Sequence, residues 1–178
     1  APSVRLSEII AHMHRRVSDV IGGQCADLES DCTTIAAYNE VARMKSGPLL
    51  GLPVELCLIA ADRSAHVSAA MAASDAIAIA YQTTDDISDV DRDTETGGLN
   101  FLTMVQGDMK SRIQAARLHA CSYAQAAIAI AKASAASAFN ARTCSNLATI
   151  SCICSLLAVP VPTTAFFTAR AAISLTSI

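Results

Sequence analysis

A long helix is predicted over residues 62–84, DRSAHVSAAMAASDAIAIAYQTT, because they lack glycine and proline and are rich in alanine, a strong helix former. The acidic string YQTTDDISDVDRD, residues 81–93, lies at the C-terminal end of this helix. Helical spacing places four polar side chains along one stripe, with Asp86 one position away from it. These four residues are Gln82, Asp85, Asp89 and Asp93.

A row of carboxylates is unfavourable at this end of a helix. Like charges four residues apart repel each other, and the helix dipole disfavours anions at the C-terminus. A bound cation would remove both penalties, and clustered carboxylates are the hard oxygen ligands that suit Mg²⁺. The string therefore fits either a divalent metal site or a solvated acidic helix end that runs into a loop.

Three motifs in order resemble the trans-isoprenyl diphosphate synthases, also called polyprenyl synthetases. The string YQTTDDISD, residues 81–89, resembles their second aspartate-rich motif. Upstream, GQCAD at 23–27 resembles the family's Gly-Gln-x-x-Asp segment. Tyr38 followed by KSG at 45–47 resembles its Tyr…Lys-Thr-Gly segment. The resemblance covers about residues 20–100.

The resemblance implies an all-α fold, an antiparallel helical bundle resembling part of the isoprenoid synthase fold. No aspartate-rich string precedes Asp85, so residues 1–178, taken as a single helical domain, resemble the second half of such an enzyme. Family members tend to carry a lysine shortly after the second motif, where this chain has TGGLN at 96–100. One diphosphate contact of the family therefore lacks a matching residue.

The activity implied by the resemblance is a Mg²⁺-dependent prenyltransferase reaction of isoprenoid biosynthesis. It condenses an allylic diphosphate with isopentenyl diphosphate to a longer trans-polyprenyl diphosphate, for example of the geranylgeranyl diphosphate type. Asp85, Asp86 and Asp89 would bind Mg²⁺ bridged to the allylic diphosphate. Lys45 and Gln82 are the predicted catalytic residues. The predicted substrate-binding residues are Gln24, Asp27, Lys45 and Gln82.

Two other interpretations fit the same residues. The chain could be a non-catalytic or regulatory subunit, or a truncated homologue, that binds a catalytic synthase partner. The three aspartates at 85, 86 and 89 count against this interpretation, because an unpaired acidic cluster has no structural reason to persist. The third interpretation is an alanine-rich helical bundle with an acidic surface patch. The resemblance also implies a homodimer, or a heterodimer with a related chain.

Composition narrows the class of protein further. The 178 residues are 52% hydrophobic and only 4% aromatic, which favours closely packed helices with an interior of Ala, Ile, Leu and Met. A net charge of −3 with scattered basic residues argues against nucleic-acid binding. Seven cysteines without a C-x-x-C pair favour a reducing compartment, the cytoplasm or an organelle interior. No signal peptide is predicted, because APSVR at 1–5 leads into an amphipathic pattern rather than an apolar run. No transmembrane segment is predicted, because the longest apolar stretch, 147–161, is shorter than the roughly 18–20 residues that span a bilayer.

The periodicity of apolar residues predicts a first helix from Ser3, which runs to Gly22-Gly23 or through them. Its solvent side is predicted to carry His12, His14, Arg15 and Arg16. A second helix is predicted from Thr33 or Thr34 to Met44 and is ended by KSGP at 45–48, since glycine and proline after a terminal lysine are a stop signal.

Further helices are predicted along the rest of the chain. In the apolar segment 49–61, Glu55 is predicted to be exposed. The glycines of the stretch 94–98 are predicted to break the chain after the acidic helix. Asp108 is predicted to cap a helix that extends to about Ser134, and two more helices are predicted over 140–158 and from 165 onward.

Overall fold

In a computed structural model of the chain, the structure describes residues 2–29 and 32–137. The chain divides into two compact units, Ala1–Thr143 and Cys144–Ile178, and every described residue lies in the first. The prediction of a single domain over 1–178 stays a prediction, and the helices predicted over 140–158 and from 165 lie outside the described residues.

The described residues are almost entirely helical and contain no strand, which confirms the predicted all-α class. The helices are α1 (Pro2–Glu29), α2 (Ile35–Ala60), α3 (Val67–Thr96), α4 (Phe101–Met104) and α5 (Met109–Ser137), with a 3₁₀ turn at Ser64–His66. No helix within 2–29 and 32–137 combines the length and hydropathy that crossing a membrane requires.

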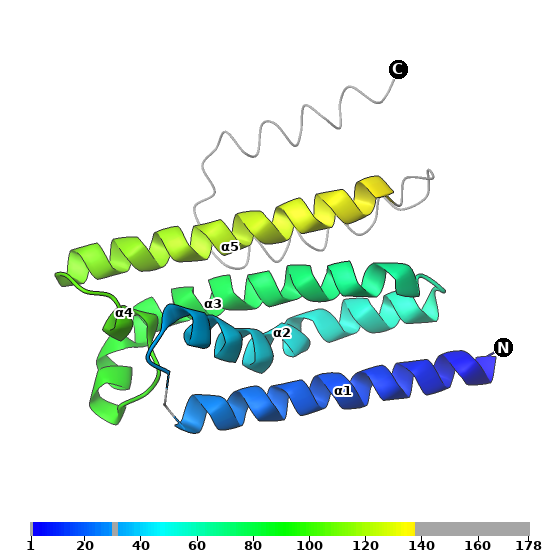
Figure 1. The fold of residues 1–178 in the computed structure, drawn as a ribbon, viewed down its shortest axis with the longest axis horizontal. Coiled ribbons are helices and arrows are strands. Elements are labelled where there is room, and N and C mark those ends of the chain that lie inside the picture. Colours follow the sequence, from blue (N-terminus) through cyan, green and yellow to red (C-terminus); the bar gives the residue numbers. More distant parts are fainter. Residues whose placement is uncertain (1, 30–31, 138–178) are drawn as a thin grey trace, which may run out of the picture. The chain divides into compact units, whose positions relative to one another are not determined.

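The four long helices alternate in direction, and each packs against the next: α1 against α2, α2 against α3, and α3 against α5 (Figure 1). The short helix α4 contacts α2, α3 and α5 near the C-terminal end of α3. A core cluster lies at that end, built from Tyr38, Phe101, Leu102 and Ala116. The acidic string of α3 therefore lies beside this core cluster.

Helix α1 buries the opposite face from the one that its apolar periodicity predicts. The side chains of His12 and Arg16 are buried, at 4% and 0% exposure, so the prediction that they face solvent is wrong. The apolar residues Ile10, Met13 and Val17 are instead 40% to 48% exposed. The periodicity of apolar residues distinguishes two faces of α1, but it does not show which face meets charged residues of the neighbouring helices. His14 and Arg15 are exposed, as predicted.

Helix α2 continues past its predicted stop. Thr34 caps its start as predicted, since its Oγ1 accepts a hydrogen bond from the backbone N–H of Ala37 at 3.1 Å. The helix then runs through Pro48 and Pro53 to Ala60, so the prediction that it ends at 45–48 is wrong. Each proline removes one helical hydrogen bond. Packing of α2 between α1 and α3 offsets that loss.

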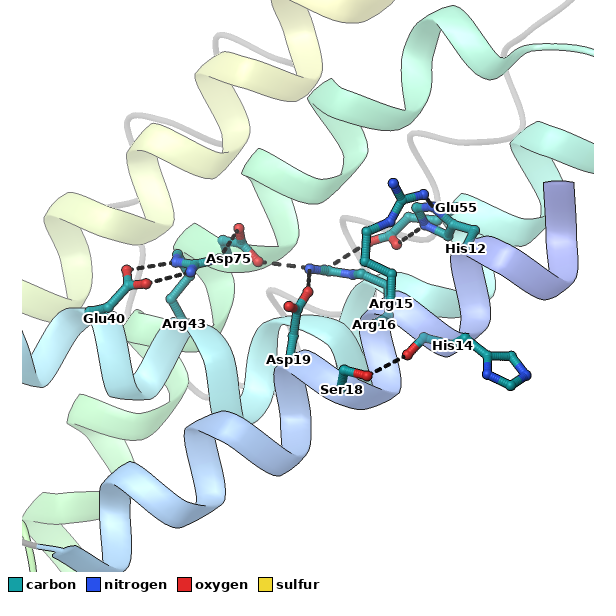
Figure 2. Close-up of polar contacts among 10 residues, drawn as sticks. All are labelled: His12, His14, Arg15, Arg16, Ser18, Asp19, Glu40, Arg43, Glu55 and Asp75. Atoms are coloured by element: carbon teal, nitrogen blue, oxygen red, sulfur yellow. Dashed lines mark hydrogen bonds and ion pairs between the residues drawn. The ribbon is translucent and has the colours of Figure 1, made fainter.

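Glu55, predicted to be exposed, is completely buried in an ionic cluster (Figure 2). Its carboxylate lies 2.6 Å from Nε2 of His12 and 3.0 Å from Nη2 of Arg16, so it joins α2 to α1. Arg16 also lies 3.5 Å from the Asp75 carboxylate on α3. Buried charges are found in proteins when they are paired in this way. The cluster therefore connects three helices through one guanidinium group.

Local signals at the ends of α3 and α5 agree with the structure. Gly97 ends α3 in the left-handed conformation with φ 71°, within the predicted break, and the N–H of Gly98 donates to the Asp93 carbonyl at 2.8 Å. Asp108 accepts a hydrogen bond from the N–H of Ser111 at 2.8 Å and so caps α5, which extends to Ser137.

Candidate functional site

The predicted residues of α1 and α2 meet through an ion pair. Nζ of Lys45 lies 2.6 Å from Oδ2 of Asp27, and both side chains are partly buried. Gln24, one turn earlier on α1, donates to the same carboxylate oxygen at 3.5 Å. Three of the predicted substrate-binding residues therefore form one connected group, in which Asp27 keeps the ammonium of Lys45 in place.

One predicted residue of α3, Asp85, lies within electrostatic range of Lys45 in this group. Partial burial of the carboxyl group and the neighbouring charge of Asp89 raise the pKa of Asp85 above its ordinary value, while Lys45 acts in the opposite direction. Asp85 is exposed, and the Asp89 side chain is 29% exposed. Both carboxylates are therefore accessible, and their mutual repulsion is relieved when a cation binds.

Arg92 covers one side of the acidic stripe. Its Nη2 lies 2.6 Å from Asp89 and 3.3 Å from Asp93, but its own side chain is 68% exposed. An ion pair this exposed is weak and is screened by salt. A divalent cation can therefore compete with Arg92 for the Asp89 carboxylate.

Asp86, the middle aspartate of the motif, points into the protein interior and is 1% exposed. Its Oδ2 accepts hydrogen bonds from the Tyr38 hydroxyl at 2.8 Å and the Phe101 backbone N–H at 2.7 Å. Its Oδ1 accepts from the side-chain amide of Gln82 at 3.0 Å. Burial still raises the pKa of Asp86, although these three donors act to lower it. Burial and the Asp86 charge also raise the pKa of Tyr38, so its hydroxyl stays protonated and donates.

Asn100 is a site residue that the sequence analysis missed. Its Nδ2 donates to the Asp86 carbonyl and to the Asp93 carboxylate, both at 2.9 Å, and it is fully buried. Its Oδ1 accepts from the N–H of Leu102 at 2.9 Å and thereby caps α4. Asparagine directly before an apolar run is a helix-start signal, and that signal could have revealed the cap.

A second missed group connects α2 to α5. The Phe101 ring stacks on His119 with ring centroids 4.6 Å apart. Asn39 accepts a hydrogen bond from Nε2 of His119 and donates one to the Tyr123 hydroxyl, both at 2.9 Å. Burial lowers the pKa of His119, which favours the neutral ring. Asn39 and His119 lie 80 residues apart in the chain, so no local sequence pattern predicts their hydrogen bond.

The side chains available as metal ligands limit how a metal ion could be bound. Among the described residues, no three His, Cys, Asp or Glu side chains gather into a metal-binding group. Two accessible carboxylates, Asp85 and Asp89, still fit Mg²⁺, which proteins commonly hold through one or two carboxylates, with water and substrate phosphates completing the octahedron. The prediction that Asp85, Asp86 and Asp89 all bind the metal stays a prediction.

Gly23 permits the close approach of α1 to α2 that brings Lys45 to Asp27. A Cβ at Gly23 would collide with the backbone nitrogen of Lys45 and lie 2.6 Å from the carbonyl carbon of Met44. At Gly22 the nearest atom is only the flexible end of the Met44 side chain, at 3.0 Å. The two adjacent glycines therefore differ in what an added methyl group meets.

We expect Gly23→Ala to lower the free energy of unfolding by about 2–3 kcal/mol, because overpacking against backbone cannot be relieved by a rotamer change. Gly22→Ala is the matched control and should change it by no more than about 1 kcal/mol, since alanine is the better helix former there. Urea unfolding of both variants measures the difference. Equal stabilities for the two variants would contradict the close approach at Gly23.

The sequence matches a known protein family. The polyprenyl synthetase family matches the chain over residues 3–145, which include every predicted site residue and the described helices except the first residue of α1. No curated protein matches the chain. Because the family match covers most of the sequence, the chain belongs to the polyprenyl synthetase family.

Proposed function

We propose that the chain is a Mg²⁺-dependent prenyltransferase that condenses an allylic diphosphate with isopentenyl diphosphate. Family membership supports prenyl transfer in general. The observation that carries the proposal is the placement of Asp85 and Asp89, two accessible carboxylates one turn apart on α3, with Asp85 within electrostatic range of Lys45. Carboxylates for a divalent cation next to a fixed ammonium group suit a diphosphate bridged to metal.

Each residue has a distinct part in the proposed reaction. Asp85 and Asp89 would hold Mg²⁺, which would neutralise negative charge on the diphosphate. Lys45 adds a point charge on the α2 side, held in position by Asp27. The diphosphate leaves with the electron pair of the C–O bond, the double bond of isopentenyl diphosphate attacks the resulting allylic carbon, and a proton is lost. Gln24 and Gln82 are proposed to line the reacting end.

We further propose that the product has trans geometry and a length of the geranylgeranyl type. The chain is proposed to correspond to the second half of a synthase and to assemble as a homodimer or as a heterodimer with a related chain.

Thermal unfolding in the presence of inorganic diphosphate tests the metal site directly. Mg²⁺ and diphosphate together are expected to raise the midpoint temperature by several degrees, because a ligand that binds only the folded state stabilises it. The Asp85→Asn/Asp89→Asn variant should lose this shift. Asp91→Asn, which removes an exposed carboxylate from the same helix, is the control and should keep it. A shift that survives the double substitution would place the metal elsewhere.

The pH dependence follows from the raised pKa of Asp85. A raised pKa means that the carboxyl holds its proton at a higher pH than an ordinary aspartate, whose pKa is about 3.9. Mg²⁺ must displace that proton, so its affinity is expected to fall with decreasing pH before ordinary aspartates titrate. Titrations with Mg²⁺ at a series of pH values measure this. Asp85→Asn should flatten the dependence, and an unchanged profile in that variant would show that another group is responsible.

A further inference from the structure

We infer that Asp86 is a positioning residue, which fixes the rotation of α3 so that Asp85 and Asp89 face outward, and that it does not itself bind the metal. This inference rests on the proposed function. It assigns different tasks to adjacent aspartates of one motif. The assignment follows from what the carboxylate of Asp86 contacts.

Three protein donors already engage three of the roughly four lone-pair sites of the Asp86 carboxylate. The Tyr38 hydroxyl and the Phe101 N–H both donate to Oδ2, and the Gln82 amide donates to Oδ1. With 1% exposure, the carboxylate has no open side toward solvent. To reach a cation on the surface it would have to leave buried donors without an acceptor, which is costly.

Because Asp86 is fixed toward the core, helix geometry makes Asp85 and Asp89 face outward. Adjacent residues of a helix are separated by about 100° around the axis, because one turn contains 3.6 residues. With Asp86 fixed toward the core, Asp85 is turned away from it, and Asp85 is indeed exposed. Asp89 lies one turn beyond Asp85 and shares its side of the helix. The rotation of α3 at Asp86 therefore decides whether the two accessible carboxylates can meet one cation.

The residues outside α3 that hold Asp86 come from two elements, α2 and α4. Tyr38 comes from α2, and Phe101 begins α4, which follows α3 in the chain. Their rings also pack edge to face, with centroids 5.5 Å apart. Asn100 adds a bridge from the segment after α3 back to the carbonyl of Asp86 and the carboxylate of Asp93. Contacts from α2 and from the segment after α3 thus meet the last turns of α3, from Asp86 to Asp93.

Substitutions at Asp86 separate charge from hydrogen bonding. An asparagine oxygen can still accept from Tyr38 and Phe101, and the Gln82 amide can rotate to present its oxygen to the new NH₂ group. Alanine offers no acceptor, so the buried Phe101 N–H loses its partner and the Tyr38 hydroxyl keeps only its longer hydrogen bond to Thr83, at 3.4 Å. A metal ligand, in contrast, needs the negative charge that both substitutions remove.

The test measures the Mg²⁺ concentration that gives half of the thermal stabilisation seen with saturating inorganic diphosphate. Asp86→Asn is expected to shift this midpoint by less than about threefold, whereas Asp85→Asn should shift it by more than tenfold. Asp86→Ala should raise the midpoint strongly and also lower the unfolding temperature without ligand. A tenfold shift in Asp86→Asn would show that Asp86 binds the metal and would overturn the inference.

Tyr38→Phe provides a second test that does not alter any carboxylate. If Asp86 is an anchor, losing the Tyr38 hydrogen bond loosens α3 and raises the Mg²⁺ midpoint by about twofold to fivefold. If Asp86 is a ligand, removing a competing donor frees its oxygen and leaves the midpoint unchanged or lower. The sign of the change therefore decides between the two roles. If the unsubstituted chain shows no Mg²⁺-dependent stabilisation, the proposed function fails and the inference falls with it.

Discussion

Replacing Glu55 by alanine is expected to lower the free energy of unfolding by about 3–5 kcal/mol, the cost of removing one partner from a buried ion pair. Glu55 and Arg16 are both 0% exposed, and their charged groups lie 3.0 Å apart. Without Glu55, the guanidinium of Arg16 would retain only the partly exposed carboxylates of Asp19 and Asp75, at 3.4 and 3.5 Å. Nε of Arg16 already lacks a hydrogen-bond partner, so little remains to compensate the charge.

The matched control is Glu40→Ala, which removes an ion pair with Arg43 at the surface of the same helix. Exposed pairs contribute about 0–1 kcal/mol, so this variant should unfold nearly as the original chain does. Urea unfolding of both variants measures the contrast. A loss below 1 kcal/mol in Glu55→Ala would mean that the buried cluster does not hold α1, α2 and α3 together.

Replacing Asp85 and Asp89 together by asparagine is expected to reduce kcat/KM for prenyl transfer by about 10³-fold or more. A metal ion supplies several kcal/mol of transition-state stabilisation, and each 1.4 kcal/mol changes the rate tenfold. Both carboxylates are accessible on one side of α3, so the substitution removes the proposed ligands without disturbing buried contacts.

Asp91→Asn is the control for this prediction, because Asp91 is exposed on the same helix and its substitution also removes a carboxylate, one where the double variant removes two. Its kcat/KM should stay within about twofold of the original value. The measurement is the steady-state rate over a series of Mg²⁺ concentrations. Comparable activity in the control and the double variant would rule out Asp85 and Asp89 as the metal ligands.

Local signals in the sequence predicted the elements that carry the site. The alanine-rich composition and the absence of glycine and proline indicated α3, and the left-handed Gly97 ends it where the break was expected. The caps Thr34 and Asp108 were also predicted, because capping depends on contacts within three residues. The acidic motif was identified for the same reason: its residues are close together in the chain.

Contacts between distant residues could not be predicted from the same information. Arg16 and Glu55 are 39 residues apart, and only their meeting explains why α1 buries a charged face. Periodicity distinguishes two faces of a helix but carries no information about the partner of either. Likewise, the stop signal before Pro48 was valid as a local rule, but packing on both sides of α2 overrides it.

In the candidate site, too, features that depend on nearby residues were predicted and contacts between distant residues were not. The sequence indicated that Asp85, Asp86 and Asp89 belong together, but it could not distinguish their orientations, because these depend on Tyr38 and Phe101. Asn39 was missed, since its partners His119 and Tyr123 come from α5. Side chains that orient a motif from other helices leave no trace in the spacing of the motif itself.

The most direct test of the central claim is the incorporation of labelled isopentenyl diphosphate into an allylic diphosphate primer by the full chain. We predict Mg²⁺-dependent formation of a product five carbons longer than the primer, or longer by a multiple of five, and loss of that product in the Asp85→Asn/Asp89→Asn variant. Absence of any elongated product, with a folded chain and saturating Mg²⁺, would contradict the proposal that this chain catalyses prenyl transfer.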